Sequence, residues 1–581
     1  MLGKANSPLR LLKRRIERKL RAQGTGYPDW TLILERSPEL WRQARAAAAH
    51  GPRVLIATTV GSHLPGTTLD SVLAVALTLR GANVELLLCD AVLPACLAAD
   101  ATWYTSMERF SRNGPQTDLC ADCYAPACRM FEQLGLRIHA LSNWVSHEER
   151  ASAAKLAETA HVSTMGRLQH DGMAVGEHAL AGTLRFFARG DLASEPQGEP
   201  ILRRYVEGAV LSAAGARRLI RERNCETVVL HHGIYVPQGA IAEATRIEGK
   251  RVVTWNPAYR KQCFIFSHND TYHHTLLDEP TGAWQNLRLT AEQEGSLMRY
   301  LQSRATGSAD WIWFHHRPSF DRAALFRDLR IDPSRPIIGL LTNVVWDAQL
   351  HYPANVFTGM TEWLVETVRY FERHPQLQLL IRVHPAEIRG TLPSRQRIQD
   401  ELRQAFPVLP RNVFVVPPES ELSTYTAMSA CDSVIVYGTK AGVELASIGV
   451  PVIVAGEAWV RNKGITIDPC DKHEYFECLS RLPLRKRMSE EATARARLYA
   501  YHFFFRRMIP LEFMEPVSGW PPYRPAVQDL GQLCAGKSRG LDVICDGILA
   551  GKPFIFPAET FPDSHRLHSG EDLTQEVDAQ P

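Results

Sequence analysis

The chain has 581 residues, of which 45% are hydrophobic and 22% are charged, and its formal net charge is +3 at pH 7. These proportions are those of ordinary globular proteins, so they exclude disordered, collagen-like and disulfide-stapled classes for the bulk of the chain. The nearly balanced charge also argues against a dedicated nucleic-acid-binding protein, and we expect no nucleic-acid partner.

The sequence carries no segment that is typical of a membrane span or a secretory signal. The most apolar stretch, residues 72–99, is interrupted by Arg80, Glu85 and Asp90, whereas a spanning helix needs about 20 consecutive apolar residues. The basic N-terminus is not followed by an apolar segment and a small-residue cleavage site. We therefore predict a cytoplasmic protein.

The first 25 residues form a basic arm with eight Lys or Arg residues and one Glu, which gives this arm a net charge of +7. Leu9, Leu12, Ile16 and Leu20 recur at helical spacing, which predicts a short helix with an apolar stripe and basic flanks. Such a helix can bind an anionic membrane surface, so peripheral association with the inner membrane face is one interpretation. The other is a helix that packs on the body of the protein.

Twelve cysteines are scattered along the chain, and we expect them to stay reduced. Cys120, Cys123 and Cys128 form a C-x2-C-x4-C cluster, with Cys96 and His139 as candidate fourth zinc ligands. A structural zinc site usually shows two clear ligand pairs, whereas this cluster shows one pair and a single cysteine. The pattern favours small buried residues at the start of a helix, and we predict no metal site.

The first half of the chain contains two strand–helix–strand units, which indicate a doubly wound α/β sheet. The predicted strands are residues 53–59, 84–89, 227–230 and 251–255. The predicted helices are residues 69–80 and 239–248, and the segments 127–160 and 202–223 are mostly helical in pattern.

The pattern restarts after a proline-rich junction at residues 331–336. Five strands alternate with helices there, which indicates a second parallel α/β sheet. The predicted strands are residues 337–341, 377–383, 413–416, 433–436 and 451–455, and the predicted helices are residues 357–373, 394–405, 422–429 and 443–448.

The predicted fold class is therefore α/β, with two Rossmann-like doubly wound domains that face each other across a cleft. We expect four segments along the chain: a basic arm and helix at 1–50, a first Rossmann-like domain at 51–330, a second at 331–480, and a helical extension with a loose acidic tail at 481–581.

In open parallel sheets, ligands bind at the carboxyl ends of the strands. Residues 437–444 (Tyr-Gly-Thr-Lys-Ala-Gly-Val-Glu) lie between a predicted strand and a predicted helix. Backbone N–H groups near Gly438 can receive a phosphate there, and Thr439 and Lys440 add a hydroxyl and a cation. Glu444, one turn into the helix, is placed to accept from ribose hydroxyls. The alternative is a tight turn with a helix-capping threonine.

Other strand ends of the second domain also carry polar residues. His384 and Pro385 follow the second strand, Asn343 and Asp347 follow the first, and Glu419 follows the third. A lone histidine at a strand end can be a satisfied, half-buried residue. Because these residues share a sheet edge with the 437–444 loop, phosphate binding is the better interpretation.

The second domain resembles the bacterial capsule polysaccharide biosynthesis proteins, which are glycosyltransferases of the GT-B fold that include Kdo transferases. The resemblance covers about residues 335–470 and rests on four motifs: Arg382-Val-His384-Pro385, Ser433 to Glu444, Gly449-Val-Pro451-Val and Gly464-Ile-Thr-Ile-Asp468. It implies that His384, Pro385 and Thr439 bind the nucleotide of a sugar donor. Gly438-Thr439 stands where that group has a Ser-Ser or Ser-Thr pair.

The first domain should then hold the acceptor, and a general base there must reach the acceptor hydroxyl. His63 and His232 each follow a predicted strand, so each is a candidate base, and Asp70 is a candidate to orient either imidazole. A reaction that retains the anomeric configuration needs no such base, because a donor phosphate oxygen can accept the proton.

The expected function is transfer of a sugar from a nucleotide-sugar donor to a surface glycan or lipid-linked glycan acceptor. Lys440, Arg382, His384 and the 438–442 turn would stabilise the departing phosphate, so we expect no metal and no cofactor. The alternatives are a nucleotide-sugar epimerase, a transferase of alditol phosphate from a CDP-alditol, and a non-catalytic scaffold of a polysaccharide assembly complex.

Overall fold

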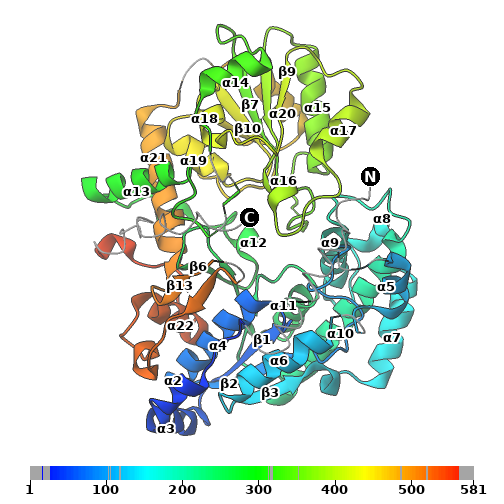
Figure 1. The fold of residues 1–581 in the computed structure, drawn as a ribbon, viewed down its shortest axis with the longest axis vertical. Helices are drawn as coiled ribbons and strands as arrows, with labels where there is room; N and C mark the ends of the chain where they lie inside the picture. The colour runs from blue at the N-terminus through cyan, green and yellow to red at the C-terminus, as the bar shows by residue number, and fades with distance from the viewer. Residues whose placement is uncertain are drawn as a thin grey trace.

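The computed structural model consists of two α/β lobes, one above the other in Figure 1, each built on a central sheet. The N-terminal arm apart from Ile16, and the tail after Phe561, lie outside the residues that the structure describes. These residues are 16, 26–102, 104, 106–116, 119–311, 313–314, 318–350, 352–484, 487–518 and 521–561.

The first lobe, which is the lower one in Figure 1, is built on a sheet that has seven strands within the described residues. Their order is β12-β6-β5-β4-β1-β2-β3. Strands β1 to β5 are parallel, whereas β6 and β12 are added in antiparallel pairings. The strands are Arg53–Thr59 (β1), Asn83–Leu88 (β2), Arg137–Ala140 (β3), Thr227–His231 (β4), Arg251–Pro257 (β5), Cys263–His268 (β6) and Ile509–Pro510 (β12).

The four strands predicted in this half of the chain are confirmed, and three others were not predicted. Strand β3 lies inside a segment that was predicted to be mostly helical, because its four residues, Arg-Ile-His-Ala, are too few to show a period. Strands β6 and β12 form the antiparallel edge, and β12 comes from a segment more than 200 residues later in the sequence.

Helices cover both faces of the first sheet. The central one, α4, is mostly apolar and is buried along almost its whole length, because it packs between the sheet and the outer helices α3 and α22. The described helices of this lobe are Thr31–Glu35 (α2), Pro38–Ala48 (α3), Leu64–Leu79 (α4), Met107–Asn113 (α5), Ala121–Glu132 (α6), His147–Glu158 (α7), Val162–Met165 (α8), Val175–Phe187 (α9), Gly198–Arg223 (α10), Gln238–Ile247 (α11), Tyr272–Thr275 (α12) and Ala291–Ser303 (α13).

The second lobe is built on a sheet of five parallel strands within the described residues, in the order β11-β10-β7-β8-β9. The five predicted strands are confirmed as Ile337–Leu341 (β7), Gln378–Arg382 (β8), Val413–Val416 (β9), Ser433–Val436 (β10) and Val452–Val454 (β11). The helices are Arg322–Leu329 (α14), Met360–Glu372 (α15), Ala386–Arg389 (α16), Ile398–Ala405 (α17), Thr424–Ser429 (α18), Ala441–Ser447 (α19) and Lys472–Ser480 (α20).

In both sheets the first strand is central, and the chain winds outward from it to each side in turn. The parallel strands of the first sheet lie in the order β3-β2-β1-β4-β5, and the second sheet repeats this order as β9-β8-β7-β10-β11. This is the Rossmann-like order, in which the topological switch point lies beside the first strand. The predicted fold class, two such domains in the GT-B arrangement, is confirmed.

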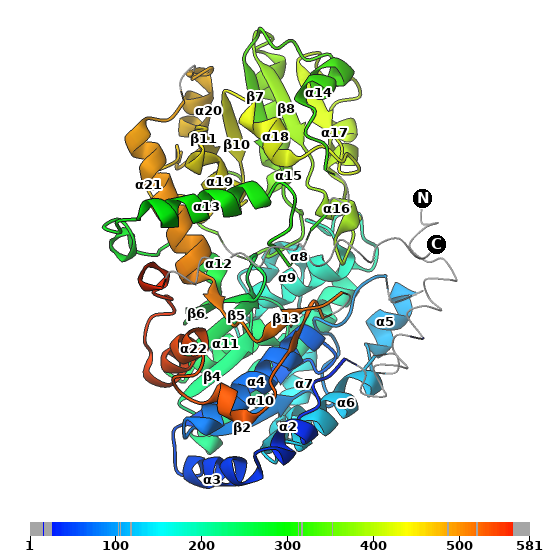
Figure 2. The same cartoon turned by 60° about the vertical axis from the view of Figure 1, so that its left-hand side comes forward.

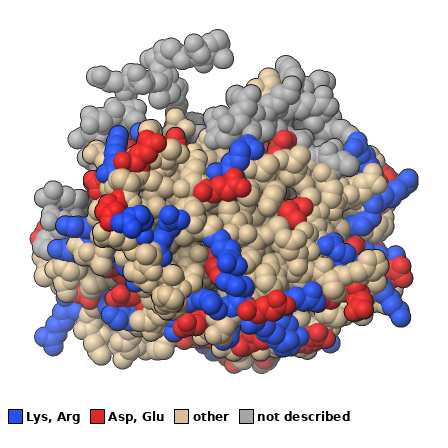
Figure 3. Space-filling view, turned by 90° about the horizontal axis from the view of Figure 1, so that it is seen from below, with Lys and Arg blue, Asp and Glu red and all other residues tan. Residues whose placement is uncertain are grey.

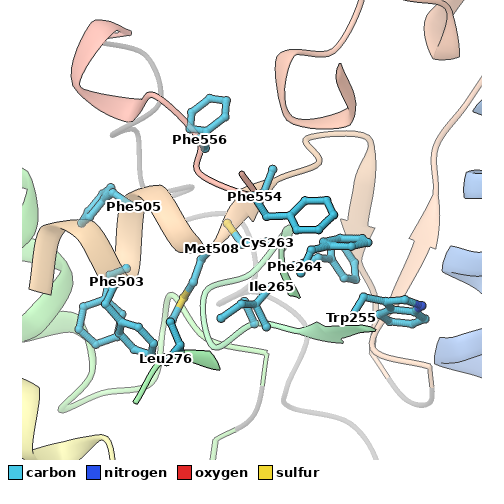
Figure 4. Close-up of a cluster of buried hydrophobic side chains, with 14 of the residues drawn as sticks. Trp255, Cys263, Phe264, Ile265, Leu276, Phe503, Phe505, Met508, Phe554 and Phe556 are labelled. Carbon is cyan, nitrogen blue, oxygen red and sulfur yellow. The ribbon is translucent and has the colours of Figure 1, made fainter. Parts of the chain in front are cut away.

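The segment after residue 480, which we expected to be a helical extension, completes the first lobe. Helix α21 (Glu490–Tyr501) packs on α19 of the second lobe and runs down to the first (Figure 2). A π-helical segment, His502–Arg507, continues it and leads into β12. Strand Tyr523–Pro525 (β14), which pairs with Met514–Pro516 (β13), and helix Arg539–Ala550 (α22) then pack on α4. Figure 4 shows Met508 and Phe554 in one buried cluster with Phe264.

Among the described helices, none has the length and apolarity to cross a bilayer. On the face of the molecule seen from below, Lys and Arg side chains are interspersed with Asp and Glu (Figure 3).

The packing of the C-terminal segment predicts a large loss of stability for Phe554→Ala. The Phe554 ring is 1% exposed and lies 4.3 Å from the His268 ring and 5.4 Å from the Phe266 ring, centroid to centroid. Removal of a buried phenyl ring typically costs about 3–5 kcal/mol. Urea unfolding should show this loss, and Val408→Ala, at a side chain that is 85% exposed, should not. Equal midpoints for the two variants would contradict the packing.

Candidate active site

A cavity of about 580 Å³ lies between the two lobes, at the carboxyl ends of the strands of both sheets. The second lobe lines it with the loops after β7, β8 and β10, and the first lobe lines it with the loops after β4 and β5. The lining includes nine of the thirteen residues that the sequence singled out: His232, Asn343, Asp347, Arg382, His384, Pro385, Gly438, Thr439 and Lys440. The other four, His63, Asp70, Glu419 and Glu444, do not line it.

His384 is fixed by its own backbone at the end of β8. Its Nδ1 accepts a hydrogen bond of 3.1 Å from the Ala386 N–H, and its own N–H donates to Thr342 Oγ1 over 3.1 Å. A neutral imidazole whose Nδ1 accepts must carry its proton on Nε2. His384 therefore presents a donor, which suits a phosphate oxygen.

Lys440 lies at the cavity wall over the Tyr259 ring, with its Nζ 4.6 Å from the ring centroid. Its Nζ also lies 3.3 Å from Oε1 of Glu444. Burial and the neighbouring Arg304 lower the pKa of Lys440 from its ordinary value, while Glu444 opposes this shift. The ammonium is thus held at the cavity by an aromatic face and a buried carboxylate.

Glu444 does not reach the position that we expected for a ribose contact. The residue is 3% exposed, and its Oε2 accepts a hydrogen bond of 2.6 Å from the Tyr425 hydroxyl. Its Oε1 forms ion pairs with Arg304 and Lys440. Since a buried carboxylate needs such partners, Glu444 is an anchor below the 437–444 loop. The expectation of a ribose contact is therefore corrected.

Arg382 lines the cavity, but its guanidinium is committed to the loop that follows β9. It donates to the carbonyl oxygens of Pro417 over 2.5 Å, Ser420 over 3.0 Å and Leu422 over 3.4 Å. Burial lowers the pKa of Arg382 to about 10, so it stays charged at neutral pH. Its charge contributes to the field in the cavity, and its hydrogen bonds hold the loop. Glu419, in this loop, is exposed and lies outside the cavity.

The turn between β10 and α19 leaves room at the cavity. A Cβ at Gly438 would have the Asn343 side-chain nitrogen, at 3.7 Å, as its nearest neighbour within 4 Å. Thr439 Oγ1 accepts from the Ala441 N–H over 3.3 Å, so its hydroxyl hydrogen is available to a ligand. The buried Oδ1 of Asn343 has no hydrogen-bond partner among the residues that the structure describes. These groups are placed for a polar ligand.

Asp347 extends from the loop after β7 toward the first lobe. Its Oδ1 accepts a hydrogen bond of 2.9 Å from the Tyr235 hydroxyl, which in turn accepts from the Ala348 N–H over 3.0 Å. Asp347 is exposed to the cavity, yet desolvation by the surrounding walls raises the pKa of its carboxyl above the ordinary value. A carboxylate of the second lobe is thus oriented by a hydroxyl of the first.

The two histidines predicted as bases differ in position. His232 lines the cavity, and its Nδ1 accepts from the Ile234 N–H over 3.1 Å. His63 caps α4, with its Nδ1 accepting from the Gly66 N–H over 3.2 Å, and its ring lies 4.6 Å from that of His231. Burial lowers the pKa of His232 well below its ordinary value and lowers that of His63 to about 4. Both imidazoles are neutral donors through Nε2.

Asp70 contacts neither of these imidazoles, which corrects the expectation that it orients one of them. Its Oδ2 accepts from the Thr58 hydroxyl over 2.8 Å, and its Oδ1 accepts from Trp255 Nε1 over 2.9 Å. The residue is fully buried in α4, and burial raises the pKa of its carboxyl to about 7. Asp70 holds the indole against which the His231 ring packs, 4.9 Å away.

The cysteine cluster lies around the start of α6. Cys123 Sγ accepts from the Ser62 N–H over 3.3 Å, and burial raises the pKa of Cys120, Cys123 and Cys128. Among the described residues, no three His, Cys, Asp or Glu side chains come together in a way that could hold a metal ion.

The sequence did not single out several residues that shape the cavity. Tyr235 lies in the loop after β4, so the strand-end rule that selected Asp347 could have found it. Arg304 carries no such signal, because its partners Asp310 and Glu444 come from different parts of the chain. The aromatic wall of Tyr259, Tyr272 and Trp459 also becomes visible only when the two lobes are brought together.

No protein-family model and no curated protein matches this sequence. The chain is similar in structure to a β-Kdo 2,4 transferase of Thermosulfurimonas dismutans, with 14% identity and a TM-score of 0.31 over 48% of this chain and 79% of that one. A UDP-GlcNAc 2-epimerase from Neisseria meningitidis, bound to UDP-GlcNAc, matches with 9% identity and a TM-score of 0.23 over 77% and 95%. An α,α-trehalose 6-phosphate synthase from Burkholderia multivorans matches with 13% identity and a TM-score of 0.27 over 78% and 96%.

The raised pKa of Asp70 predicts an unusual dependence of stability on pH. Between its unfolded value, near 4, and its folded value, about 7, the folded state binds more protons at this carboxyl. Relative to Asp70→Asn, the wild type should therefore lose stability as the pH rises from 4 to 7, at up to about 1.4 kcal/mol per pH unit, and no more above 7. Urea unfolding of both proteins between pH 5 and 8 measures this difference, and a pH-independent difference would contradict it.

Proposed function

We propose that the protein is a glycosyltransferase that moves a sugar from a nucleotide-sugar donor to a hydroxyl of a glycan or lipid-linked glycan. The observation that carries this proposal is the set of side chains that lines the interlobe cavity described above. Three side chains of the second lobe can bind a phosphate: His384, Thr439 and Lys440. They face a wall of the first lobe that carries aromatic rings and hydroxyls. A reaction that joins two substrates needs such a two-sided site.

The donor phosphate would bind at the second lobe. His384 donates through Nε2, Thr439 donates through its hydroxyl, and Lys440 supplies a positive charge that Glu444 and Tyr259 hold in place. Charge that develops on the departing phosphate is then met by groups that need no rearrangement. Because the protein supplies this charge itself, we propose a reaction that needs no divalent metal and no cofactor.

The acceptor would bind against the first lobe. Tyr259 and Tyr272 of that lobe and Trp459 of the second lobe form an aromatic wall, with the Tyr272 and Trp459 ring centroids 5.3 Å apart. Aromatic faces suit the C–H faces of a pyranose ring, and the polar groups beside them can fix its hydroxyls. A volume of about 580 Å³ is within the usual range for a site that holds a small ligand.

A peripheral position on the inner membrane face fits a lipid-linked acceptor. The basic arm of residues 1–25, with its net charge of +7, would provide the attachment to anionic lipid. A cytoplasmic location with such an attachment is part of this proposal.

His384→Ala tests the donor site. We expect turnover to fall at least tenfold, about 1.4 kcal/mol of transition-state stabilisation, because a charge-assisted hydrogen bond to the phosphate is lost. The assay follows transfer from labelled nucleotide-sugars to a glycan acceptor. His161→Ala, at a histidine that is 60% exposed, is the matched control and should keep wild-type turnover. Wild-type turnover in His384→Ala would contradict the donor site, and epimerisation of the donor without acceptor would favour the epimerase.

Nucleotide binding gives a second test of the same site. A ligand at 100 times its dissociation constant stabilises a protein by about 2.7 kcal/mol, so CMP, CDP, UDP and GDP can be compared by thermal unfolding. We expect at least one to stabilise the wild type and to stabilise His384→Ala less. Stabilisation by CMP or CDP alone indicates a Kdo-type donor or an alditol phosphate, and stabilisation by UDP indicates a hexose donor. No stabilisation by any of them would favour the non-catalytic scaffold.

A further inference from the structure

Three carboxylates line the cavity, and they differ in what their oxygens contact. Asp310 is buried, with its oxygens bound to Arg304 and the Tyr300 hydroxyl. Glu457 accepts from the Ala354 N–H, within its own lobe. Asp347 reaches across to the first lobe, where its Oδ1 accepts from Tyr235. Tyr235 is the one side-chain donor to this carboxylate among the described residues, and the Asp347 side chain is exposed to the cavity.

Two histidines at the cavity cannot serve as the base in the tautomers that their hydrogen bonds fix. His232 and His384 use Nδ1 to accept from a backbone N–H, so each has a proton on Nε2 and no second lone pair to offer. His273 also lines the cavity, and burial lowers the pKa of its imidazole to about 3. These rings can donate hydrogen bonds, but a proton acceptor must come from elsewhere.

We propose that Asp347 is the general base for the acceptor hydroxyl and that Tyr235 is the residue that positions its carboxylate. This assignment rests on the proposed glycosyl transfer and deepens it. A base needs an open oxygen at the acceptor side of the cavity and a fixed orientation, and Asp347 has both. The Tyr235 hydroxyl provides the orientation, because the Ala348 N–H occupies its acceptor side and its proton points to Asp347.

The step is balanced by the groups already named. The acceptor hydroxyl gives its proton to Oδ2 of Asp347 while its oxygen forms a bond to the anomeric carbon of the donor. The bond from that carbon to the phosphate oxygen breaks, and its electron pair leaves with the nucleotide. Asp347 then releases the proton to water when the product departs. A dedicated base on the acceptor predicts inversion of the anomeric configuration, whereas retention would let the donor phosphate take the proton.

The environment of Asp347 predicts the pH dependence of kcat/KM. Desolvation raises the pKa of its carboxyl, while the Tyr235 hydrogen bond and the positive charge of Arg185 lower it. The other titratable groups that interact with it electrostatically are hydroxyls, Tyr259, Tyr272 and Tyr352, whose own pKa values Asp347 raises. Activity should therefore fall on the acid side as Asp347 is protonated, and removal of the Tyr235 hydroxyl should move that limb to higher pH.

Asp347→Asn tests the base directly. We expect transfer to fall by about 10²–10⁴-fold and the acid limb of the pH profile to disappear. Stabilisation by the donor nucleotide should stay within about twofold of wild type in apparent affinity, because the phosphate groups are untouched. Asp400→Asn, at a solvent-exposed aspartate of α17, is the control and should keep wild-type transfer and its acid limb. An acid limb that persists in Asp347→Asn and disappears in Glu457→Gln would overturn the assignment.

Two further variants separate the base from its positioning residue. Tyr235→Phe should keep an acid limb but shift it to higher pH and lower kcat, and an unshifted limb would remove Tyr235 from the role. Asp347→Ala should recover transfer when formate is added, because a small carboxylate can fill the vacated space. If the wild type transfers sugar and Asp347→Asn transfers it at the same rate, only the assignment of the base is overturned. No transfer by the wild type from any nucleotide-sugar would overturn the proposed function, and the assignment with it.

Discussion

The buried carboxylate of Glu444 is the interaction on which the geometry of the cavity depends. An ionised carboxylate inside a protein is costly unless each oxygen is paired, and Glu444 is paired with Arg304, Lys440 and Tyr425. Arg304 in turn binds Asp310, so the network joins the end of α13 to helix α19, which follows the turn after β10. Glu444 and the Tyr259 ring together hold the ammonium of Lys440 at the cavity wall. Loss of Arg304 would leave Asp310 without the cation that pairs with it.

Three histidines in or near this site share a hydrogen bond that fixes their tautomer. In His63, His232 and His384, Nδ1 accepts from a backbone N–H two or three residues later in the chain, which fixes the proton on Nε2. Burial lowers the pKa of His63 and His232, so those rings stay neutral at physiological pH. Rings held in this way are hydrogen-bond donors. In the proposed transfer, proton acceptance then belongs to a carboxylate, and we assign this role to Asp347.

The sequence predicted the five strands of the second sheet but only part of the site, for a physical reason. All five of its strands are short apolar runs bounded by turns, and a strand-end rule places His384, Thr439 and Asp347 at one edge. The same rule does not show which way a side chain turns. Glu444 turned away from the cavity because Arg304, 140 residues earlier in the chain, offered a buried partner. Pairings between distant segments, including β12 with β6, leave no local pattern.

With Asp347 as the base, the catalytic group and the residue that orients it come from different lobes. The carboxylate belongs to the lobe that would hold the donor, whereas the Tyr235 hydroxyl that orients it belongs to the other lobe. Contacts on the flanks hold the lobes together: the Gly190 N–H donates to Gln396 Oε1 over 2.8 Å, and Lys463 Nζ donates to the Leu277 carbonyl over 2.9 Å. The base is therefore complete only when the lobes are closed. In an open state the donor would be exposed to water without an oriented base, which limits wasteful hydrolysis before the acceptor is bound.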